Sequence, residues 1–386
     1  MNATLNRRQF VFRGSVLAAA AALARGPFAG LAFGDDAAEG KVLPFLDIQP
    51  MQPGKPAINW QDLTDWMTPA TDFFSVSHYG AAKVSADGYK LAVTGLVSKP
   101  LSLSLDELKS RPRKEVTATL ECSGNGASPG FMGAIGNAKW AGTPLVGVLK
   151  EAGVAPEAVE VAFWGADTGK EKIRGAEYEQ NFARSLSIAH AMRDDVLLAY
   201  EMNGKPLAPG HGFPLRLIVP GWYGIAWVKW LTTLEVRDRR LMNRFMARDY
   251  VTVRGIQNGN AIQWKETSVG PMNIKSLVAR VIQKKDGSAT VQGAAWTDGT
   301  PLKSVELKID DGPWLPATLD TQHRARYSWT FWTFDWKNPR PGEHTLVSRA
   351  TDEKGRIQPA ADDPAIKLKK TYWEANGQYP RRVRVG

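Results

Sequence analysis

The sequence predicts an α+β protein, with a mixed α/β domain over residues 45–258 and an immunoglobulin-like β-sandwich over residues 268–386. Three observations support this fold class. The chain has 386 residues, which is more than one hydrophobic core usually serves. Before residue 258, apolar strand-like runs alternate with helix-like segments and glycine-rich loops. Beyond Ser268, short alternating runs are separated by Asp-Gly turns, and no helical period interrupts them.

Composition limits the classes of function. A hydrophobic content of 43% with 10% aromatic residues indicates a packed globular protein. The formal net charge is +10, but no basic run is interleaved with aromatic residues, so nucleic acid is not an expected partner. Cys122 is the only cysteine, which excludes an intrachain disulfide. The Cys-x-x-Cys-His pattern of covalent haem attachment is also missing from this chain.

Residues 1–34 are predicted to be a twin-arginine export signal. Asn6-Arg7-Arg8-Gln9-Phe10 precedes a moderately apolar, alanine-rich run over 16–24, and small residues follow at 32–34. The apolar run is too short to span a membrane as a helix, and no other stretch is long and apolar enough. We therefore expect a periplasmic protein without a membrane span, exported in its folded form.

The mixed domain is expected to begin with a strand over 89–95. Ser104 and Glu107 form a capping-box pattern, which predicts a helix start near residue 104. Apolar periodicity and alternation predict the elements that follow. The predicted helices are 143–152 and 185–193, and the predicted strands are 116–120, 159–164, 196–200, 215–219 and 228–236.

The sandwich is predicted from alternation of period two. Val305, Leu307 and Ile309 face one side of a strand, while the charged residues between them face the other. The strand-like runs of this region are 278–281, 289–295, 305–309, 327–336 and 344–350.

The stretch around Cys122 is the first candidate for chemistry. The strand over 116–120 delivers the thiol into Ser123-Gly124-Asn125-Gly126, where small residues let the backbone approach a bound group closely. A thiolate at a strand end beside backbone N–H groups suits a metal ligand or a nucleophile. A buried cysteine that acts as a small hydrophobic residue is the alternative, and composition alone favours it.

A second candidate site lies around Pro209-Gly-His-Gly-Phe-Pro-Leu-Arg216. His211 and Arg216 lie where a loop enters a strand, and Lys229 adds a further positive charge. These groups suit a phosphate, because arginine binds phosphate with two parallel hydrogen bonds. An ordinary polar loop is the alternative. His78 also lies in a loop, whereas His190, His323 and His344 are most simply surface or packing residues.

Several stretches together resemble the sulfite oxidase family of molybdenum enzymes, in order and over nearly the whole mature chain. The matching stretches are Leu120-Glu-Cys-Ser-Gly-Asn125, Asn137-Ala-Lys-Trp-Ala-Gly-Thr-Pro-Leu145, Leu198-Ala-Tyr-Glu-Met-Asn-Gly-Lys-Pro-Leu207, His211-Gly-Phe-Pro-Leu-Arg216 and Val219-Pro-Gly221 with Val228-Lys-Trp230. The C-terminal sandwich resembles that family's dimerisation domain. The resemblance implies a homodimer.

The resemblance also implies a molybdopterin cofactor whose molybdenum takes the Cys122 sulfur as its one protein ligand. Tyr250 matches the family's active-site tyrosine, and Trp140 matches a tryptophan of the pocket wall. The residues that match positions holding the pterin and its phosphate are His78, Asp167, His211, Arg216 and Lys229. The segments expected to wrap the cofactor, partly through backbone, are Phe74, Ser75, Val76, Ser77 and His78, and the turn Trp227-Val228-Lys229.

The implied activity is oxidation of sulfite to sulfate by oxo transfer. With no haem domain in this chain, the expected electron acceptor is an external cytochrome c. Three positions depart from the family pattern, because Val76, Ala127 and Asn376 stand where substrate-binding arginines are expected. Arg248 and Arg381 are candidates to replace them. The alternatives are a less anionic substrate, including reductive removal of oxygen from a sulfoxide, and a noncatalytic binding protein of the same fold.

Overall fold

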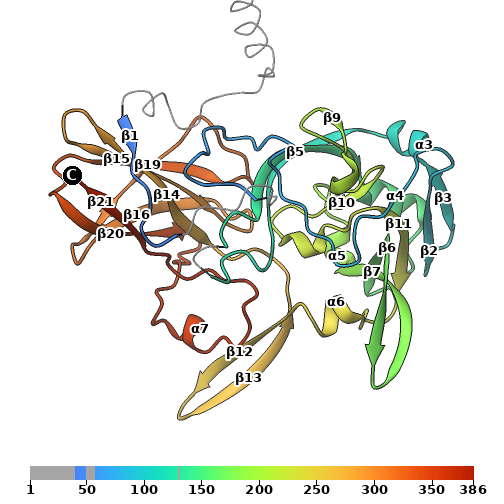
Figure 1. Cartoon of the computed structure of the whole chain (residues 1–386). Helices are drawn as coiled ribbons and strands as arrows, with labels where there is room; N and C mark the ends of the chain where they lie inside the picture. The colour runs from blue at the N-terminus through green and yellow to red at the C-terminus, as the bar shows by residue number, and fades with distance from the viewer. Residues whose placement is uncertain (1–39, 49–56, 129–130) are drawn as a thin grey trace, which may run out of the picture.

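The computed structural model describes residues 40–48, 57–128 and 131–386, and this part of the chain is mostly sheet with few helices (Figure 1). The predicted export signal at 1–34 lies outside the described residues. Among the residues described, no helix is long and apolar enough to cross a membrane.

Two sheets build the N-terminal half. In the first, the strand order is β3-β2-β11-β6-β7, and only β2 and β11 run parallel. Its strands are β2 Lys90–Gly95, β3 Leu101–Ser104, β6 Glu160–Ile173, β7 Ala176–Ser187 and β11 Leu231–Arg237. In the second, the order is β10-β8-β5-β4, with β9 beside β8. Its strands are β4 Lys114–Glu121, β5 Ile135–Pro144, β8 Leu197–Met202, β9 Lys205–Pro206 and β10 Arg216–Ile218.

The helices of this half are short. Ser104 and Glu107 form the expected capping box at α3, because each side chain accepts a hydrogen bond from the other residue's backbone N–H. The helix predicted over 143–152 is α4, and Gly153 ends it in the left-handed conformation at φ 69°. The helical elements are α3 Leu105–Lys109, α4 Leu145–Ala152, α5 Ile188–Ala191 and α6 Arg244–Ala247, with 3₁₀ turns η1 Pro209–His211 and η2 Gly224–Ala226.

Two predictions of secondary structure were wrong. The helix expected over 185–193 is limited to α5, because the residues up to Ser187 pair with β6 as the end of β7. The strand expected over 159–164 continues to Ile173, and β12 Val251–Asn258 pairs with β13 Ala261–Ser268 as a further hairpin. Both hairpins extend downward from the body in Figure 1. The outer residues of β6 are polar and give no apolar alternation, whereas β13 alternates Ile262 and Trp264 with polar residues although all its residues are exposed.

The C-terminal half contains two sheets that share one hydrophobic cluster. The first has the order β1-β14-β15-β19-β18, and the second has the order β17-β16-β20-β21. The strands are β1 Gly40–Val42, β14 Lys275–Lys284, β15 Ala289–Trp296, β16 Leu302–Ile309, β17 Trp314–Pro316, β18 Thr318–Leu319, β19 Thr330–Trp336, β20 Gly342–Asp352 and β21 Arg381–Val385, with α7 Pro364–Lys367. Two facing sheets are compatible with the expected sandwich, while its immunoglobulin-like topology stays a prediction.

The first described residues belong to this C-terminal half. Strand β1 pairs with β14, and Leu43 and Phe45 are buried in the C-terminal hydrophobic cluster. The described chain therefore runs along the second half at residues 40–45 before it enters the first.

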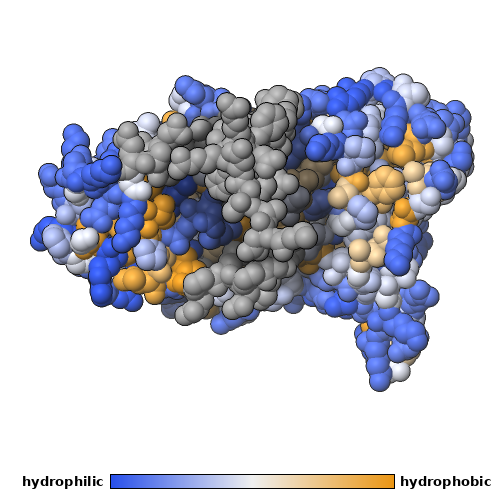
Figure 2. Space-filling view, turned by 45° about the horizontal axis from the view of Figure 1, so that its top comes forward, coloured by the Kyte–Doolittle hydropathy of each residue, from blue (hydrophilic) through white to orange (hydrophobic). Residues whose placement is uncertain are grey.

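A second hydrophobic cluster joins the two halves. Trp60 stacks on Trp296 with ring centroids 6.0 Å apart, and it also contacts Trp329 at 5.5 Å. The Trp329 indole N–H donates to the carbonyl of Trp66 at 2.9 Å. On the described surface seen in Figure 2, hydrophilic residues predominate and apolar ones lie in small patches. The large aromatic residues thus contribute to a core that spans both halves.

Trp329→Ala is predicted to destabilise the whole protein. The Trp329 side chain is fully buried between the halves, and removing such a group costs about 3–5 kcal/mol. Because the core is shared, denaturant unfolding should keep a single transition at a lower midpoint. Trp314→Ala, on a half-buried strand of the C-terminal half, is the matched control and should cost less. Two separate transitions for the Trp329 variant would contradict a shared core.

Candidate active site

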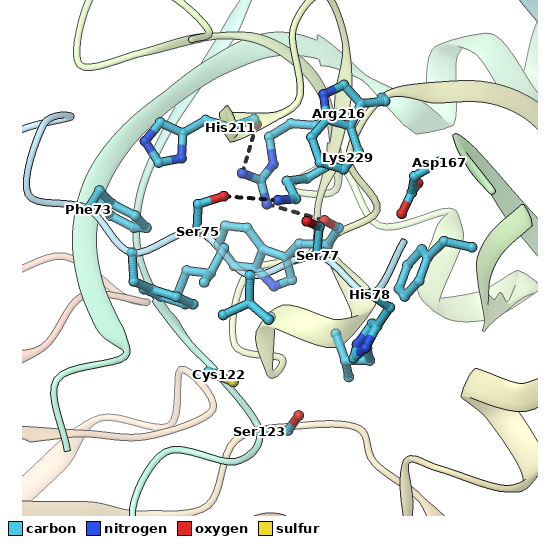
Figure 3. A pocket seen from close by; sticks show the side chains of 18 of the residues that line it. Phe73, Ser75, Ser77, His78, Cys122, Ser123, Asp167, His211, Arg216 and Lys229 are labelled. Carbon is cyan, nitrogen blue, oxygen red and sulfur yellow. Dashed lines mark hydrogen bonds between the residues drawn. The ribbon is translucent and has the colours of Figure 1, made fainter. Parts of the chain in front are cut away.

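A pocket of about 660 Å³, counting the space at its mouth, opens between the two N-terminal sheets and the loop at 73–78. Figure 3 shows Cys122 and Ser123 at one end and His211, Arg216, Lys229 and Asp167 toward the other. Most of the residues predicted for the site line this pocket. Those that do are Phe74, Ser75, Val76, Ser77, His78, Cys122, Asp167, His211, Arg216, Trp227, Lys229 and Tyr250.

Cys122 follows the last residue of β4, so the strand delivers the thiol as predicted. Its backbone N–H donates to the carbonyl of Ala134 at 2.9 Å, and its carbonyl accepts from the N–H of Asn125 at 2.9 Å. Burial raises the pKa of the Cys122 thiol, while nearby backbone N–H groups at Gly124 and Asn125 oppose that rise. The pocket therefore keeps the free thiol protonated, and a metal ion would have to displace that proton.

The opposite end holds buried positive charge. Arg216 donates to the carbonyls of His211 and Trp227 at 3.0 and 3.2 Å, and burial lowers its pKa to about 9. The Lys229 ammonium donates to Ser75 Oγ and to the Gly210 carbonyl, both at 3.1 Å, and burial lowers its pKa to about 7. Within the described residues, no carboxylate lies at ion-pair distance from either cation. An anion such as a phosphate would offset this cost of burial.

Asp167 lies at an irregularity of the β6–β7 pairing, where the register shifts between Trp164 and Thr168. Such a bulge turns a side chain out of the regular alternation. Asp167 Oδ1 is buried and, among the described residues, has no hydrogen-bond partner, and burial raises the pKa of Asp167 to about 6. A ligand with N–H donors, such as a pterin ring, would satisfy this oxygen.

The side wall carries a tyrosine–histidine pair. The Tyr250 hydroxyl and His78 Nε2 are 2.7 Å apart, and Tyr250 stacks on Trp373 at 4.2 Å. Burial raises the pKa of Tyr250, and burial together with the charge of Arg244 lowers the pKa of His78. At neutral pH the phenol therefore stays protonated and the imidazole stays neutral, so Tyr250 can donate and His78 can accept.

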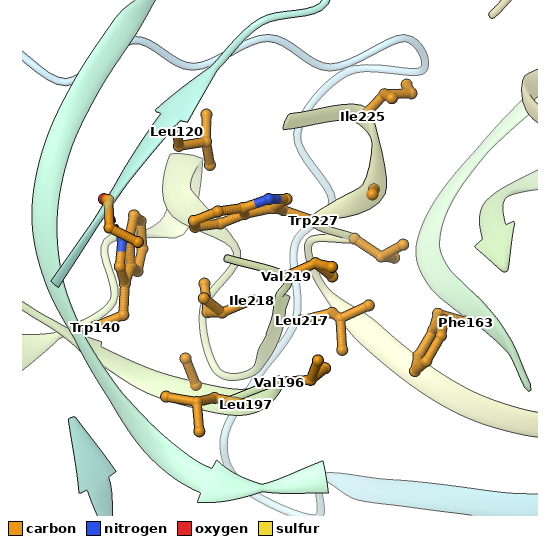
Figure 4. Packing of buried hydrophobic residues seen from close by; sticks show 14 of the residues in the cluster. Leu120, Trp140, Phe163, Val196, Leu197, Leu217, Ile218, Val219, Ile225 and Trp227 are labelled. Carbon is orange, nitrogen blue, oxygen red and sulfur yellow. Dashed lines mark hydrogen bonds between the residues drawn. The ribbon is translucent and has the colours of Figure 1, made fainter. Parts of the chain in front are cut away.

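Trp140 and Val228 do not line the pocket, which corrects the expectation of a pocket wall at Trp140. Trp140 is fully buried behind it, edge-on to Phe73 and Trp227 at 5.7 and 5.6 Å, with the Arg216 guanidinium 4.9 Å from its ring (Figure 4). The Val228 carbonyl accepts from the Leu217 N–H at 2.8 Å. Neighbouring residues of an extended segment face opposite ways, so Val228 enters the core while Trp227 and Lys229 face the pocket.

Sequence reasoning missed several lining residues. The apolar ones are Phe73, Leu120, Phe182, Ile225 and Trp230, and Ser123 and Gly224 complete the set. Leu120 and Ser123 stand in the matching stretch around Cys122. Trp230 directly follows the predicted Lys229, and its ring lies 4.3 Å from the Lys229 ammonium. Neither Arg248 nor Arg381 lines the pocket. Arg248 is exposed near Tyr178, and Arg381 pairs with Asp47.

Comparisons with known proteins give the family. Residues 78–245 match the oxidoreductase molybdopterin binding domain. The mitochondrial sulfite oxidases of Drosophila melanogaster and Homo sapiens are each 32% identical to the chain, over 76% and 79% of its length. The chain spans only 55% and 59% of those two proteins. Sulfite oxidase of Gallus gallus is 33% identical, over 79% of this chain and 70% of the relative. The chain belongs to the sulfite oxidase family.

A solved structure extends the likeness to nearly the whole chain. The crystal structure of the sulfane dehydrogenase SoxCD from Paracoccus pantotrophus matches with a TM-score of 0.73 and 27% identity, covering 93% of both chains. Family membership makes the protein an oxidoreductase with a molybdopterin–molybdenum cofactor.

The residues present fit that cofactor. Arg216 and Lys229 supply positive charge without a carboxylate among the described residues, and Asp167 Oδ1 is a buried acceptor without a donor. Cys122 is a sulfur ligand at the far end of the same pocket. A phosphate and a pterin ring find matching chemistry at the end with Arg216, Lys229 and Asp167, and a metal ion finds it at the Cys122 end.

Lys229→Met is predicted to stabilise the cofactor-free protein while weakening its hold on the cofactor. Burial lowers the pKa of Lys229 from 10.5 to about 7, so the unfolded chain binds the proton more tightly. Wild-type stability therefore rises with pH between these two values, and the advantage of the variant is largest below about pH 7. Urea unfolding at about pH 6 and about pH 9 measures this difference.

Lys170→Met is the matched control, because Lys170 is exposed on the β6–β7 hairpin. It should change neither the pH dependence nor the molybdenum content. Parallel pH profiles for wild type and the Lys229 variant would contradict a buried, unpaired Lys229.

Cys122→Ser is predicted to remove molybdenum from a protein that still folds. A hydroxyl is a far weaker ligand than a thiolate for this metal, while serine fits the volume of cysteine. Metal analysis, with the unfolding midpoint as the check on folding, measures the result. Unchanged molybdenum occupancy and unchanged activity would contradict both the assignment of Cys122 as ligand and the interpretation of the protein as an enzyme.

Proposed function

We propose that the protein oxidises a sulfur substrate by oxo transfer at a molybdenum bound to Cys122, and passes the electrons one at a time to an external cytochrome c. The observation that carries this proposal is a pocket that joins the Cys122 thiol to two buried cations, Arg216 and Lys229, with no carboxylate at ion-pair distance among the described residues. Sulfite, oxidised to sulfate, is the first candidate substrate, because several relatives similar to the chain are named sulfite oxidases. When bound, the molybdenum centre supplies the transferable oxygen and accepts two electrons.

The chain's own groups hold the reactants. Tyr250 is a fixed donor at the Cys122 end, since its ring is held by Trp373 and its hydroxyl by His78. The phenol has one proton, which it can donate to an oxygen of the substrate or product when neutral His78 carries its own proton on Nε2 and donates it to the phenol oxygen. The apolar residues Leu120 and Ile225 line the same space and limit the access of water.

A less anionic substrate is the second candidate, and the pocket favours it over sulfite. The lining cations, Arg216 and Lys229, lie toward the cofactor end among the described residues (Figure 3). Val76 lines the pocket and is 50% exposed, where the family pattern has an arginine. Asn376 donates instead to the Ile274 carbonyl at 3.4 Å. A reduced sulfur carrying little charge needs no guanidinium partner, and SoxCD, which is similar to this chain, is named a sulfane dehydrogenase.

The test is steady-state oxidation by the molybdenum-loaded enzyme, with cytochrome c or ferricyanide as acceptor. Sulfite, dimethyl sulfide as an uncharged reduced-sulfur probe that oxo transfer would convert to a sulfoxide, and a sulfoxide with a reduced dye are compared at equal concentrations. The proposal predicts substrate-dependent cytochrome c reduction that needs Cys122. Activity with dimethyl sulfide above that with sulfite supports the second candidate, and the reverse order supports the first. Sulfoxide reduction alone, without oxidation of either sulfur compound, would contradict the proposed direction of transfer.

Val76→Arg is predicted to raise kcat/KM for sulfite. A charge-assisted hydrogen bond is worth about 1.5–3 kcal/mol, which corresponds to roughly a 10- to 100-fold gain. Val76→Gln adds length without charge and is the matched control. The gain should appear mainly as a lower KM for sulfite, with little change for an uncharged sulfur substrate. Equal effects of arginine and glutamine would show that charge at this position does not limit sulfite use.

We also propose that the twin-arginine segment directs export to the periplasm and that the mature protein is a homodimer. Arg7-Arg8 before an apolar run supports the first proposal. Arg7→Lys/Arg8→Lys should leave the protein in the cytoplasm, and unchanged export would contradict it. Light scattering of the mature protein tests the second proposal, which a monomer mass would contradict.

A further inference from the structure

A fully buried ion pair connects the C-terminal half to the residue beside Cys122. Lys275, the first residue of β14, pairs its ammonium with Glu121, the last residue of β4. Both side chains are inaccessible to solvent. Lys275 also donates to the Asn125 carbonyl at 3.2 Å. A lysine from the second half therefore contacts both ends of the loop that carries the thiol.

Two further donors complete the environment of Glu121. Trp296 Nε1 donates to Oε2 at 2.8 Å, and the Asn125 side-chain amide donates to Oε1 at 3.0 Å. Trp296 stands directly opposite Lys275 in the β14–β15 pairing. Paired strands thus present a charged donor and a neutral donor to one carboxylate, so both its oxygens are satisfied.

Asn125 links the Glu121 carboxylate to the backbone of Cys122 through hydrogen bonds. Its side-chain oxygen accepts from the Ala134 N–H at 3.1 Å, and its backbone N–H donates to the Cys122 carbonyl at 2.9 Å. The Ala134 carbonyl in turn accepts from the Cys122 N–H at 2.9 Å. Glu121 and Asn125, which flank the thiol on either side, are therefore both held by contacts to Lys275.

Stability alone does not account for such a cluster. Taking two charges out of water costs free energy that their attraction recovers only in part, and well-packed apolar residues often serve as well or better. Groups that hold a metal ligand, by contrast, fix its orientation and tune the metal. The cluster of Glu121, Asn125, Lys275 and Trp296, which we call the Glu121 cluster, surrounds the backbone of the proposed ligand.

We propose that Lys275 and Trp296, both from the C-terminal half, are positioning residues for the molybdenum ligand Cys122 and act through Glu121. This inference rests on the proposed role of Cys122 and deepens it. The C-terminal half then contributes to the metal site itself, in addition to any role in association. The Glu121 cluster sets the direction from which the sulfur meets the metal.

The test is the double variant Glu121→Gln/Lys275→Met in the full mature protein. It removes both charges together, keeps an acceptor oxygen for Trp296, and fills the space of the lysine stem. The proposal predicts an altered molybdenum(V) resonance spectrum and about a tenfold faster loss of molybdenum on dialysis. In the cofactor-free protein, alkylation of Cys122, the chain's only cysteine, should also change in rate several-fold.

The matched control is Glu306→Gln/Arg349→Met, a pair at 2.8 Å on β16 and β20 of the same half. It should leave the spectrum, the molybdenum retention and the alkylation rate at wild-type values. A folded Glu121/Lys275 double variant with wild-type values in all three measurements would overturn the proposal. Such a result would make the pair a link between the halves and nothing more.

Trp296→Phe decides the matter if the double variant does not fold. This change removes only the N–H that meets Glu121 Oε2 and keeps most of the packing. The spectrum should shift in the same sense, and an unchanged spectrum and retention would overturn the proposal. Because none of these readouts uses a substrate, the outcome is independent of whether the enzyme oxidises sulfite. A wild-type protein whose molybdenum signal does not depend on Cys122 would instead refute the ligand assignment.

Discussion

The site depends on positive charge that is buried with no carboxylate at ion-pair distance among the described residues. Arg216 and Lys229 lie in the inner part of the pocket, and burial lowers the pKa of both. Burying these cations without a counter-charge lowers the stability of the folded protein. A bound anionic ligand would offset this cost. Asp167 shows the complementary defect, an acceptor without a donor. A pterin that carries a phosphate would supply negative charge to the cations and N–H donors to Asp167. Binding of such a group would account for the burial of these residues.

The Cys122 end of the pocket carries much less charge than the end with Arg216 and Lys229. Cys122 and Tyr250 line it with a thiol and a phenol that stays protonated, and Val76 adds an apolar side chain to the pocket. The charges nearest to Cys122 in the fold, Glu121 and Lys275, neutralise each other outside the pocket. The pocket therefore separates a cationic cofactor end from a substrate end of low charge. This separation is the physical basis of our proposal that the substrate is a weakly charged sulfur compound.

Much of this organisation could be predicted from sequence. The strand before Cys122, the capping box at Ser104 and the convergence of His211, Arg216 and Lys229 all rest on local patterns, and the structure confirms them. The β12–β13 hairpin was missed although Asn258-Gly259 marks its turn and Ile262 and Trp264 alternate with polar residues on β13, where both are exposed. Trp140 was misplaced because a motif match gives no side-chain direction. The pair of Glu121 and Lys275 joins residues 154 apart in the chain, and no local pattern predicts such a contact.

The most direct test of this account is calorimetric titration of sulfate, an unreactive doubly charged oxyanion, into the molybdenum-loaded enzyme. In that form the cofactor already occupies Arg216 and Lys229, so only the substrate end is open to the anion. The account predicts weak binding, with Kd of about 1 mM or above, because no guanidinium lines that end among the described residues. Binding with Kd of about 1 μM would contradict it, because such affinity requires a cationic partner beside the metal site.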